Sequence, residues 1–214
     1  FIFFYVVITF FKQYRQNYEN MQTIIMSGLI IISFLLQMLI NGFTELFYFD
    51  PLKALEEPWR FITAMFLHGS FLHLFFNLYA LLMFGSILER KIGNKNFLKI
   101  FILSGLSGSI FYYLTVLLSI ALPIPALGAS GGVYGILAAC AVFFPQMVIY
   151  IWFFPMKMKE AVIFWVITEF IGTFNVNSGI ASAAHLGGLI AGYLYAKQLI
   201  KRTYDEWWMK IAVK

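Results

Sequence analysis

The sequence predicts an all-α fold: a polytopic membrane protein built as one bundle of six transmembrane helices. Of the 214 residues, 61% are hydrophobic and only 12% are charged, and the apolar residues form long runs separated by short basic stretches. Soluble domains carry about 25% charged residues, and a chain of this length has too little interior to hide the excess apolar surface. That surface is therefore expected to face lipid.

Six apolar segments are candidate spans, since about 20 apolar residues cross a bilayer. The fourth and fifth are short, so they need tilt or burial in the bundle, where protein or water satisfies a helix end. We expect an N-terminal segment (1–22), apolar and then cytoplasmic, a membrane domain (23–200) and a cytoplasmic tail (201–214). The six segments are 23–40, 71–88, 97–118, 130–144, 161–174 and 181–200.

The basic residues indicate the orientation of the bundle. With six spans, all of the 15 Lys and Arg residues except Lys53 and Arg60 fall on the side of the amino terminus. Basic loops stay in the cytoplasm, so we expect both termini there, in a bacterial-type cell membrane. The net charge of +5 then reflects the orientation of the chain in the membrane, and no nucleic acid partner is expected. The apolar run 1–11 is too short to span alone. Whether it belongs to an additional span stays open, and a cleaved signal peptide is not expected.

A serine and a histidine are candidates for a nucleophile and its base. Ser130 lies in the run Gly-Ala-Ser-Gly-Gly and begins the fourth apolar segment, while His185 lies near the start of the sixth. Both fall toward the outer leaflet. A helix amino terminus offers unpaired N–H groups that stabilise an oxyanion, and an imidazole titrates near neutral pH. Alternatively, Ser130 is a helix cap or packing residue and His185 is bonded to a backbone carbonyl.

Small residues predict that the helices of Ser130 and His185 pack closely. Gly131, Gly135 and Ala139 recur at every fourth position in one segment, and Gly188 and Gly192 do so in the other. Such faces let membrane helices approach backbone to backbone. Close packing by itself is the simpler explanation of these glycines, but the same approach would bring a hydroxyl into reach of an imidazole.

Other polar residues in the apolar segments are candidate supporting groups. His73 and Asn77 share one helix face and could donate hydrogen bonds to an oxyanion or to another helix. His68 precedes that helix and is expected to be a structural partner. Tyr134 could stack on the imidazole or merely pack. Glu169 could orient His185, but we expect it to face water or lipid headgroups, which leaves a Ser-His dyad.

Metal and thiol chemistry are not expected. The single cysteine, Cys140, lies in the middle of an apolar segment, where a small packing role is the simplest interpretation. No zinc motif is present, and serine-histidine chemistry needs no cofactor.

Five short motifs follow one another in order between Trp59 and Gly192. They are Trp59-Arg60, His68-Gly-Ser-Phe-Leu-His73-Leu-Phe-Phe-Asn77, Glu89-Arg90, Gly128-Ala-Ser130-Gly131 and His185-Leu-Gly-Gly188-Leu-Ile-Ala-Gly192. Each motif alone is weak, but the ordered set is specific. The set resembles the rhomboid family of intramembrane serine proteases.

The resemblance implies a role for each matching residue. Ser130 would be the nucleophile and His185 the base, acting as a dyad, with His73, Asn77 and the Ser130 backbone N–H forming the oxyanion site. The remaining matches are supporting: the stacking aromatic Tyr134, the histidine His68, the close-packing glycines Gly188 and Gly192, the outer-loop pair Trp59 and Arg60, and the helix-end pair Glu89 and Arg90.

These residues together predict an intramembrane serine endopeptidase. Its partners would be the lipid bilayer and single-span membrane proteins, cleaved where a helix frays near the outer face, with small residues around the scissile bond. Two other functions are weighed: a non-catalytic scaffold that binds membrane helices, which would need neither Ser130 nor His185, and a small-molecule channel or transporter, for which Glu169 offers the one intramembrane charge. The sequence does not define the oligomeric state.

Overall fold

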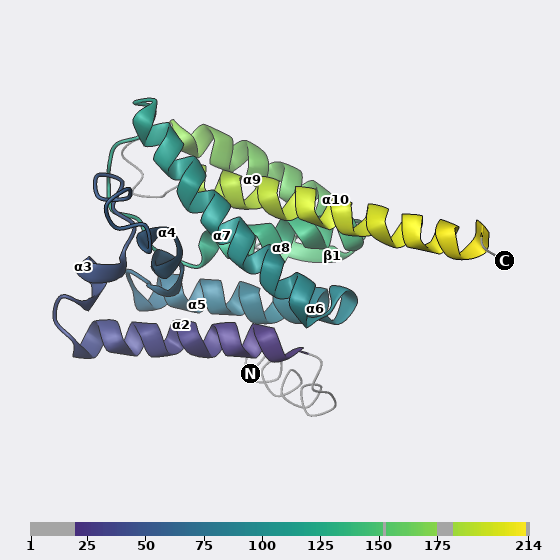
Figure 1. The fold of residues 1–214 in the computed structure, drawn as a ribbon, viewed down its shortest axis with the longest axis horizontal. Helices are drawn as coiled ribbons and strands as arrows, with labels where there is room; N and C mark the ends of the chain where they lie inside the picture. Colours follow the sequence, from purple (N-terminus) through teal and green to yellow (C-terminus); the bar gives the residue numbers. More distant parts are fainter. Residues whose placement is uncertain (1–19, 152, 175–181, 213–214) are drawn as a thin grey trace.

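The computed structural model describes residues 20–151, 153–174 and 182–212, which form a mostly helical bundle (Figure 1). In the described residues, each of the six apolar segments is helical over most of its length. The expected apolar run 1–11 and most of the N-terminal segment lie outside the described residues. The helices are α2 (Met21–Leu39), α3 (Phe43–Phe47), α4 (Arg60–Thr63), α5 (Phe71–Ala80), α6 (Ser86–Ile92), α7 (Asn94–Leu117), α8 (Ser130–Phe143), α9 (Met158–Thr173) and α10 (Ser182–Ala212).

The second segment is one continuous helical rod with a local widening. Ser70 caps it by accepting a hydrogen bond from the His73 backbone N–H at 3.1 Å. A π-helical stretch, Leu81–Gly85, joins α5 to α6. The rod ends at Gly93, whose φ of 78° is costly for any residue with a Cβ atom. The chain then turns directly into α7.

The prediction of an all-α fold is wrong at one connection. Between α8 and α9 the chain forms a two-stranded antiparallel hairpin of β1 (Val148–Ile151) and β2 (Phe154–Lys157). Strand β1 consists of β-branched and aromatic residues whose exposure alternates along the strand, a composition that favours strands. Pro155 fits because each strand of a two-stranded hairpin has a free edge.

Helix α10 does not end where the last apolar segment ends. It continues as one helix to Ala212 and projects beyond the rest of the bundle (Figure 1). Lys, Arg and Glu residues after 200 have high helix propensity, so the helix extends beyond the end of the apolar segment.

A buried carboxylate joins the start of α2 to α6. Glu89 is fully buried and accepts hydrogen bonds from the backbone N–H groups of Gln22 and Thr23, at 2.8 and 2.9 Å, and from the Thr23 hydroxyl at 2.6 Å. An anion satisfies the unpaired donors of a helix amino terminus. This contact gives Glu89 of the Glu89-Arg90 motif a structural role.

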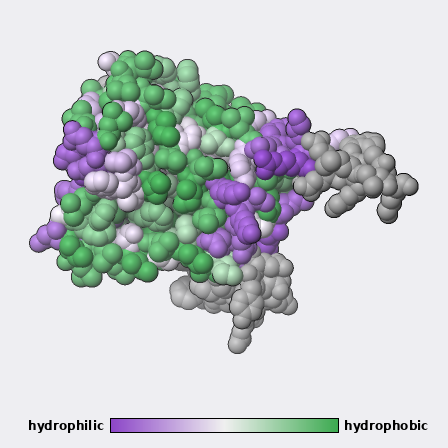
Figure 2. All heavy atoms as spheres, in the orientation of Figure 1, coloured by the Kyte–Doolittle hydropathy of each residue, from purple (hydrophilic) through white to green (hydrophobic). Residues whose placement is uncertain are grey.

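The surface of the bundle is suited to lipid. Figure 2 shows an apolar surface across the middle of the molecule, with hydrophilic residues gathered toward the two ends of the helices. Among the described residues, three helices are long and apolar enough to cross a membrane, and α8 is a shorter apolar helix. The three are Met21–Leu39, Phe71–Ile92 and Asn94–Leu117.

Candidate active site

Two helix starts bring Ser130 and His185 together. Ser130 is the first residue of α8, and His185 lies in the first turn of α10. His185 Nε2 is 2.8 Å from the Ser130 hydroxyl oxygen, a normal hydrogen-bond length. A serine hydroxyl in contact with an imidazole nitrogen is the arrangement that nucleophilic catalysis by serine needs.

Close helix packing makes this contact possible. A Cβ atom on Gly188 would overlap with the Gly131 carbonyl oxygen, and one on Gly192 would overlap with the Gly135 carbonyl oxygen. The third helix in contact, α7, approaches α10 through Gly108, where a Cβ atom would lie 2.6 Å from the Ala184 carbonyl oxygen. Backbone-to-backbone packing of this kind is what small residues permit in membrane helices.

Tyr134 holds the imidazole from one face. Its ring lies one turn after Ser130 on α8, and the ring centroids of Tyr134 and His185 are 4.4 Å apart with an interplanar angle of 17°. This is a stacked geometry, which limits rotation of the imidazole plane.

The expectation that Glu169 faces water or headgroups is wrong. Glu169 Oε1 lies 3.1 Å from His185 Nδ1 and accepts a hydrogen bond from the Tyr134 hydroxyl at 2.6 Å. Its side chain is only 12% exposed. The reason is helix periodicity: on α9, Ala161, Trp165 and Glu169 recur every four residues and share the protein-facing side. That spacing could have placed Glu169 from the sequence.

His73 borders the space beside Ser130. Gly128 precedes α8 with a φ of 132°, and a Cβ atom there would meet the His73 ring Nε2 at 2.9 Å and the Ser130 hydroxyl at 3.6 Å. Gly128 therefore lets the imidazole of His73 and the hydroxyl of Ser130 approach the same small volume. A donor in this position can face a carbonyl oxygen under attack by Ser130.

Asn77 lies one turn after His73 on α5 and is buried. Its side-chain amide donates to the His73 backbone carbonyl at 2.9 Å. An amide has a second N–H, which could serve an oxyanion.

His68 is a buried neighbour of His73. The two ring centroids are 4.9 Å apart at 62°, and Gln37 bonds the His68 backbone N–H at 2.9 Å and carbonyl at 3.3 Å. Burial first, and the positive charge that His73 can carry second, lower the pKa of His68 to about 4. His68 is therefore neutral at physiological pH and supports the position of His73.

A cavity of about 40 Å³ opens beside Ser130. A water molecule needs about 10–15 Å³ on this measure, so the cavity has room for water or for a small side chain. Most of the residues around it are small, among them Ala64, Gly105, Gly131 and Ala184, and Ser109 and Tyr112 also border it.

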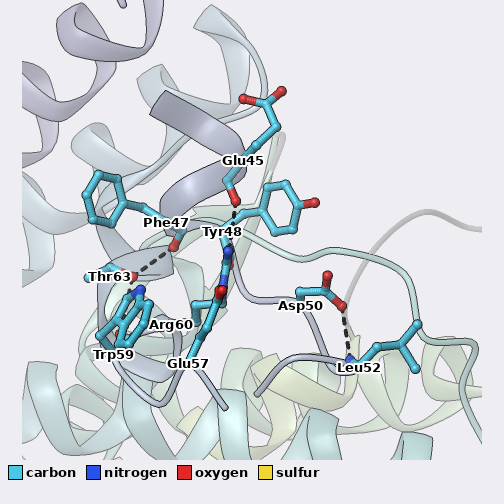
Figure 3. A network of polar contacts seen from close by, with 9 residues as sticks. All are labelled: Glu45, Phe47, Tyr48, Asp50, Leu52, Glu57, Trp59, Arg60 and Thr63. Carbon is cyan, nitrogen blue, oxygen red and sulfur yellow. Dashed lines mark hydrogen bonds and ion pairs between the residues drawn. The ribbon is translucent and has the colours of Figure 1, made fainter. Parts of the chain in front are cut away.

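Arg60 organises the loop between α2 and α5 (Figure 3). It is 3% exposed, pairs with Glu57, and donates to the carbonyl groups of Glu45 and Tyr48, both at 2.8 Å. Trp59 beside it is half exposed. The loop reaches the site through Ala64, whose carbonyl accepts the Gly128 N–H at 2.9 Å. Arg60 is thus a structural residue of this loop.

The fold and these contacts define a class: an integral membrane helix bundle with a serine-histidine pair between two closely packed helices. The chain belongs to the rhomboid family, because the family model for the rhomboid domain matches residues 55–202.

Curated proteins of this family are similar to the chain. The rhomboid protease GluP of Bacillus subtilis is 31% identical over 157 residues, which cover 70% of this chain and 28% of that protein. Rhomboid protein 1, mitochondrial, of Saccharomyces cerevisiae is 34% identical over 154 residues, 68% of this chain and 43% of the relative. RHOMBOID-like protein 6, mitochondrial, of Arabidopsis thaliana is 28% identical over 152 residues, 71% and 47% respectively. The matches span less than half of these relatives.

Proposed function

We propose that this protein is an intramembrane serine endopeptidase that cleaves single-span membrane proteins. The observation that carries the proposal is the 2.8 Å contact between His185 Nε2 and the Ser130 hydroxyl. A scaffold that only binds helices has no use for this pair, so the contact favours catalysis over that alternative. Several relatives are named as proteases, among them the rhomboid protease GluP of Bacillus subtilis and Rhomboid-like protease 1 of Toxoplasma gondii.

The chemistry proceeds in two halves. Ser130 Oγ attacks the scissile carbonyl carbon while its proton moves to His185 Nε2, and the negative oxygen faces His73, Asn77 and the Ser130 backbone N–H. The tetrahedral intermediate collapses when Nε2 returns the proton to the leaving amine, which yields an acyl-enzyme. Water, activated by the same nitrogen, then attacks the ester carbonyl and releases the new carboxyl end and free Ser130.

The site constrains the substrate. A peptide bond inside a regular helix is shielded by its own backbone hydrogen bonding, so the substrate helix must unwind before the carbonyl group can reach Ser130. The small residues around the cavity of about 40 Å³ favour a small side chain next to the cleaved bond. Helix-weakening Gly or Pro near that bond would lower the cost of unwinding.

We further propose six spans with both termini in the cytoplasm. In support, the start of α2 and the end of α10 lie toward one end of the bundle, and the Arg60 loop lies toward the other (Figure 1). The excess of basic residues on the side of the termini agrees with the positive-inside rule. Ser130 and His185 then lie toward the outer leaflet.

The experiment compares serine variants of the chain in liposomes with a fluorescent single-span reporter. Ser130→Ala should lower cleavage by about 10⁴-fold or more, since the nucleophile is lost, and should abolish labelling by a fluorophosphonate probe. Ser109→Ala is the matched control, because Ser109 borders the same cavity, and it should keep both properties. Cleavage by Ser130→Ala at the original rate, or labelling that depends on Ser109, would overturn the proposal.

A further inference from the structure

A carboxylate approaches the imidazole from the side opposite the nucleophile. Glu169 Oε1 lies 3.1 Å from His185 Nδ1, whereas the Ser130 hydroxyl lies 2.8 Å from Nε2. The side chains of His185 and Glu169 are each 12% exposed. The three groups therefore form one sheltered chain of contacts that runs from α8 through α10 to α9.

The carboxylate is held in place by hydroxyl groups from two helices. Tyr134 of α8 donates to Oε1 at 2.6 Å, and Ser182 of α10 also hydrogen-bonds the carboxylate. A charged group in a membrane segment is costly unless it has partners. Its three side-chain partners here, His185, Tyr134 and Ser182, all belong to or adjoin the catalytic pair. No lipid or headgroup role explains that arrangement.

We propose that Glu169 is a positioning residue for His185, so that the site works as a Ser130–His185–Glu169 chain rather than as a dyad. This inference rests on the proposed protease function. The carboxylate favours the imidazole tautomer with its proton on Nδ1, which leaves the lone pair of Nε2 toward Ser130. When Nε2 takes the serine proton, the negative charge stabilises the imidazolium, and Glu169 itself stays ionised throughout.

The contact between His185 Nδ1 and Glu169 has the length of a hydrogen bond but not its alignment. Nδ1 is buried and lies within 3.1 Å of Oε1, but its N–H is not aligned with that oxygen. Catalytic hydrogen bonds are often poorly aligned without substrate and tighten when it binds. We expect a small rotation of the Glu169 side chain to complete the bond, since stacking on Tyr134 restricts rotation of the imidazole ring.

The titratable groups that face His185 come from three helices. Tyr134 comes from α8 and Glu169 from α9, and the charge of His73 from α5 couples to that of His185. Helix α7 meets this part of α10 through Gly108 and through the Ser107 hydroxyl, which donates to the Gly187 carbonyl at 3.1 Å. Glu169 is thus the anionic group whose removal should alter the charge balance at His185.

The test measures cleavage of the reporter against pH for Glu169→Gln. At neutral pH we expect kcat to fall by about 10²-fold or more with KM nearly unchanged, because imidazolium stabilisation is lost. The acid limb of the profile should move to lower pH by about one to three units, since a protonated imidazole is no longer favoured by a nearby anion. Glu169→Asp, which keeps the charge, should restore part of the activity.

Two further variants make the test specific. Glu160→Gln is the matched control: Glu160 is on the same helix, exposed, near the other end, and its variant should behave as the original protein. Tyr134→Phe keeps the stacked ring but removes a donor to the carboxylate. Without that donor, the negative charge of Glu169 acts more strongly on the His185 imidazole, so the acid limb of the pH profile should move to higher pH. This variant tests the proposal even if Glu169→Gln does not fold.

The outcomes separate this inference from the proposed function. An acid limb that stays in place in both Glu169→Gln and Tyr134→Phe would overturn the positioning role, and so would a uniform loss of activity that Asp does not relieve. Failure of the original chain to cleave the reporter or to bind the fluorophosphonate would instead defeat the protease proposal itself, and the role of Glu169 with it.

Discussion

Gly188 of α10 lies so close to Gly131 of α8 that a Cβ atom on Gly188 would overlap with the Gly131 carbonyl oxygen. Gly131 follows Ser130 directly, and Gly188 lies one turn after His185. The backbone contact between the two glycines therefore sets how far apart the hydroxyl and the imidazole can be, and the 2.8 Å contact depends on it.

Substitution of Gly188 by Ala should separate the two helices and disable the site. We expect destabilisation by about 1–3 kcal/mol, the usual cost of overpacking, and loss of activity of about 10²-fold, since catalysis is sensitive to misplacement near 1 Å. Gly28→Ala is the control: nothing lies within 4 Å of its Cβ position in α2, so that variant should keep its activity and melt no earlier. Both are measured by reporter cleavage and thermal melting in detergent. Equal activity in the two variants would contradict the prediction.

Asn77→Ala tests the oxyanion side of the site. Removing one donor from an oxyanion site lowers kcat by about 10²–10³-fold, so we expect a loss of that order with little change in KM. Asn96→Ala is a matched control, because Asn96 also donates to the carbonyl group four residues earlier, at 2.8 Å. Steady-state kinetics on the reporter measure both. A kcat for Asn77→Ala equal to that of Asn96→Ala would remove Asn77 from the site.

The lowered pKa of His68 predicts that the stability of the fold depends on pH. Its pKa falls from 6.5 to about 4 on folding, so between these values the unfolded chain binds the proton and the folded chain does not. The contribution of His68 to the free energy of unfolding is then fully present above pH 6.5. It is lost as the pH falls toward about 4, which lowers the free energy of unfolding by at most about 3 kcal/mol.

The measurement is thermal melting of the original protein and of His68→Asn between pH 7 and pH 4, using detergent-solubilised samples. The variant lacks the titrating ring, so its melting temperature should depend less on pH in this range. A steeper or an unchanged pH dependence in His68→Asn would show that His68 is not the group responsible.

Much of the site followed from the positions of a few residues. Ser130 and His185 stood at the starts of apolar segments, and the four-residue spacing of the glycines predicted that their helices pack closely. The prediction for Glu169 is wrong because the surroundings of a single carboxylate in an apolar segment do not follow from the composition of that segment. Its spacing from Ala161 and Trp165 put it on the inner face, but its partners belong to α8 and α10, far away in the sequence.

The hairpin β1–β2 was missed for a related reason. Its residues are mostly apolar and lie between two apolar segments, so composition alone made them part of a connection. The pairing of Val148 with Lys157 and of Ile149 with Met156 depends on how the chain turns between them, which hydropathy does not report.

The amino-acid sequence by itself determined that this chain forms a membrane helix bundle of the rhomboid type, because long apolar runs, small-residue faces and ordered motifs are local properties of the chain. Only the tertiary structure decided which group stands behind the imidazole, because that choice depends on the rotation of α9 against α8 and α10. A shift of one residue along α9 would turn Glu169 by about 100°, away from His185 and toward lipid.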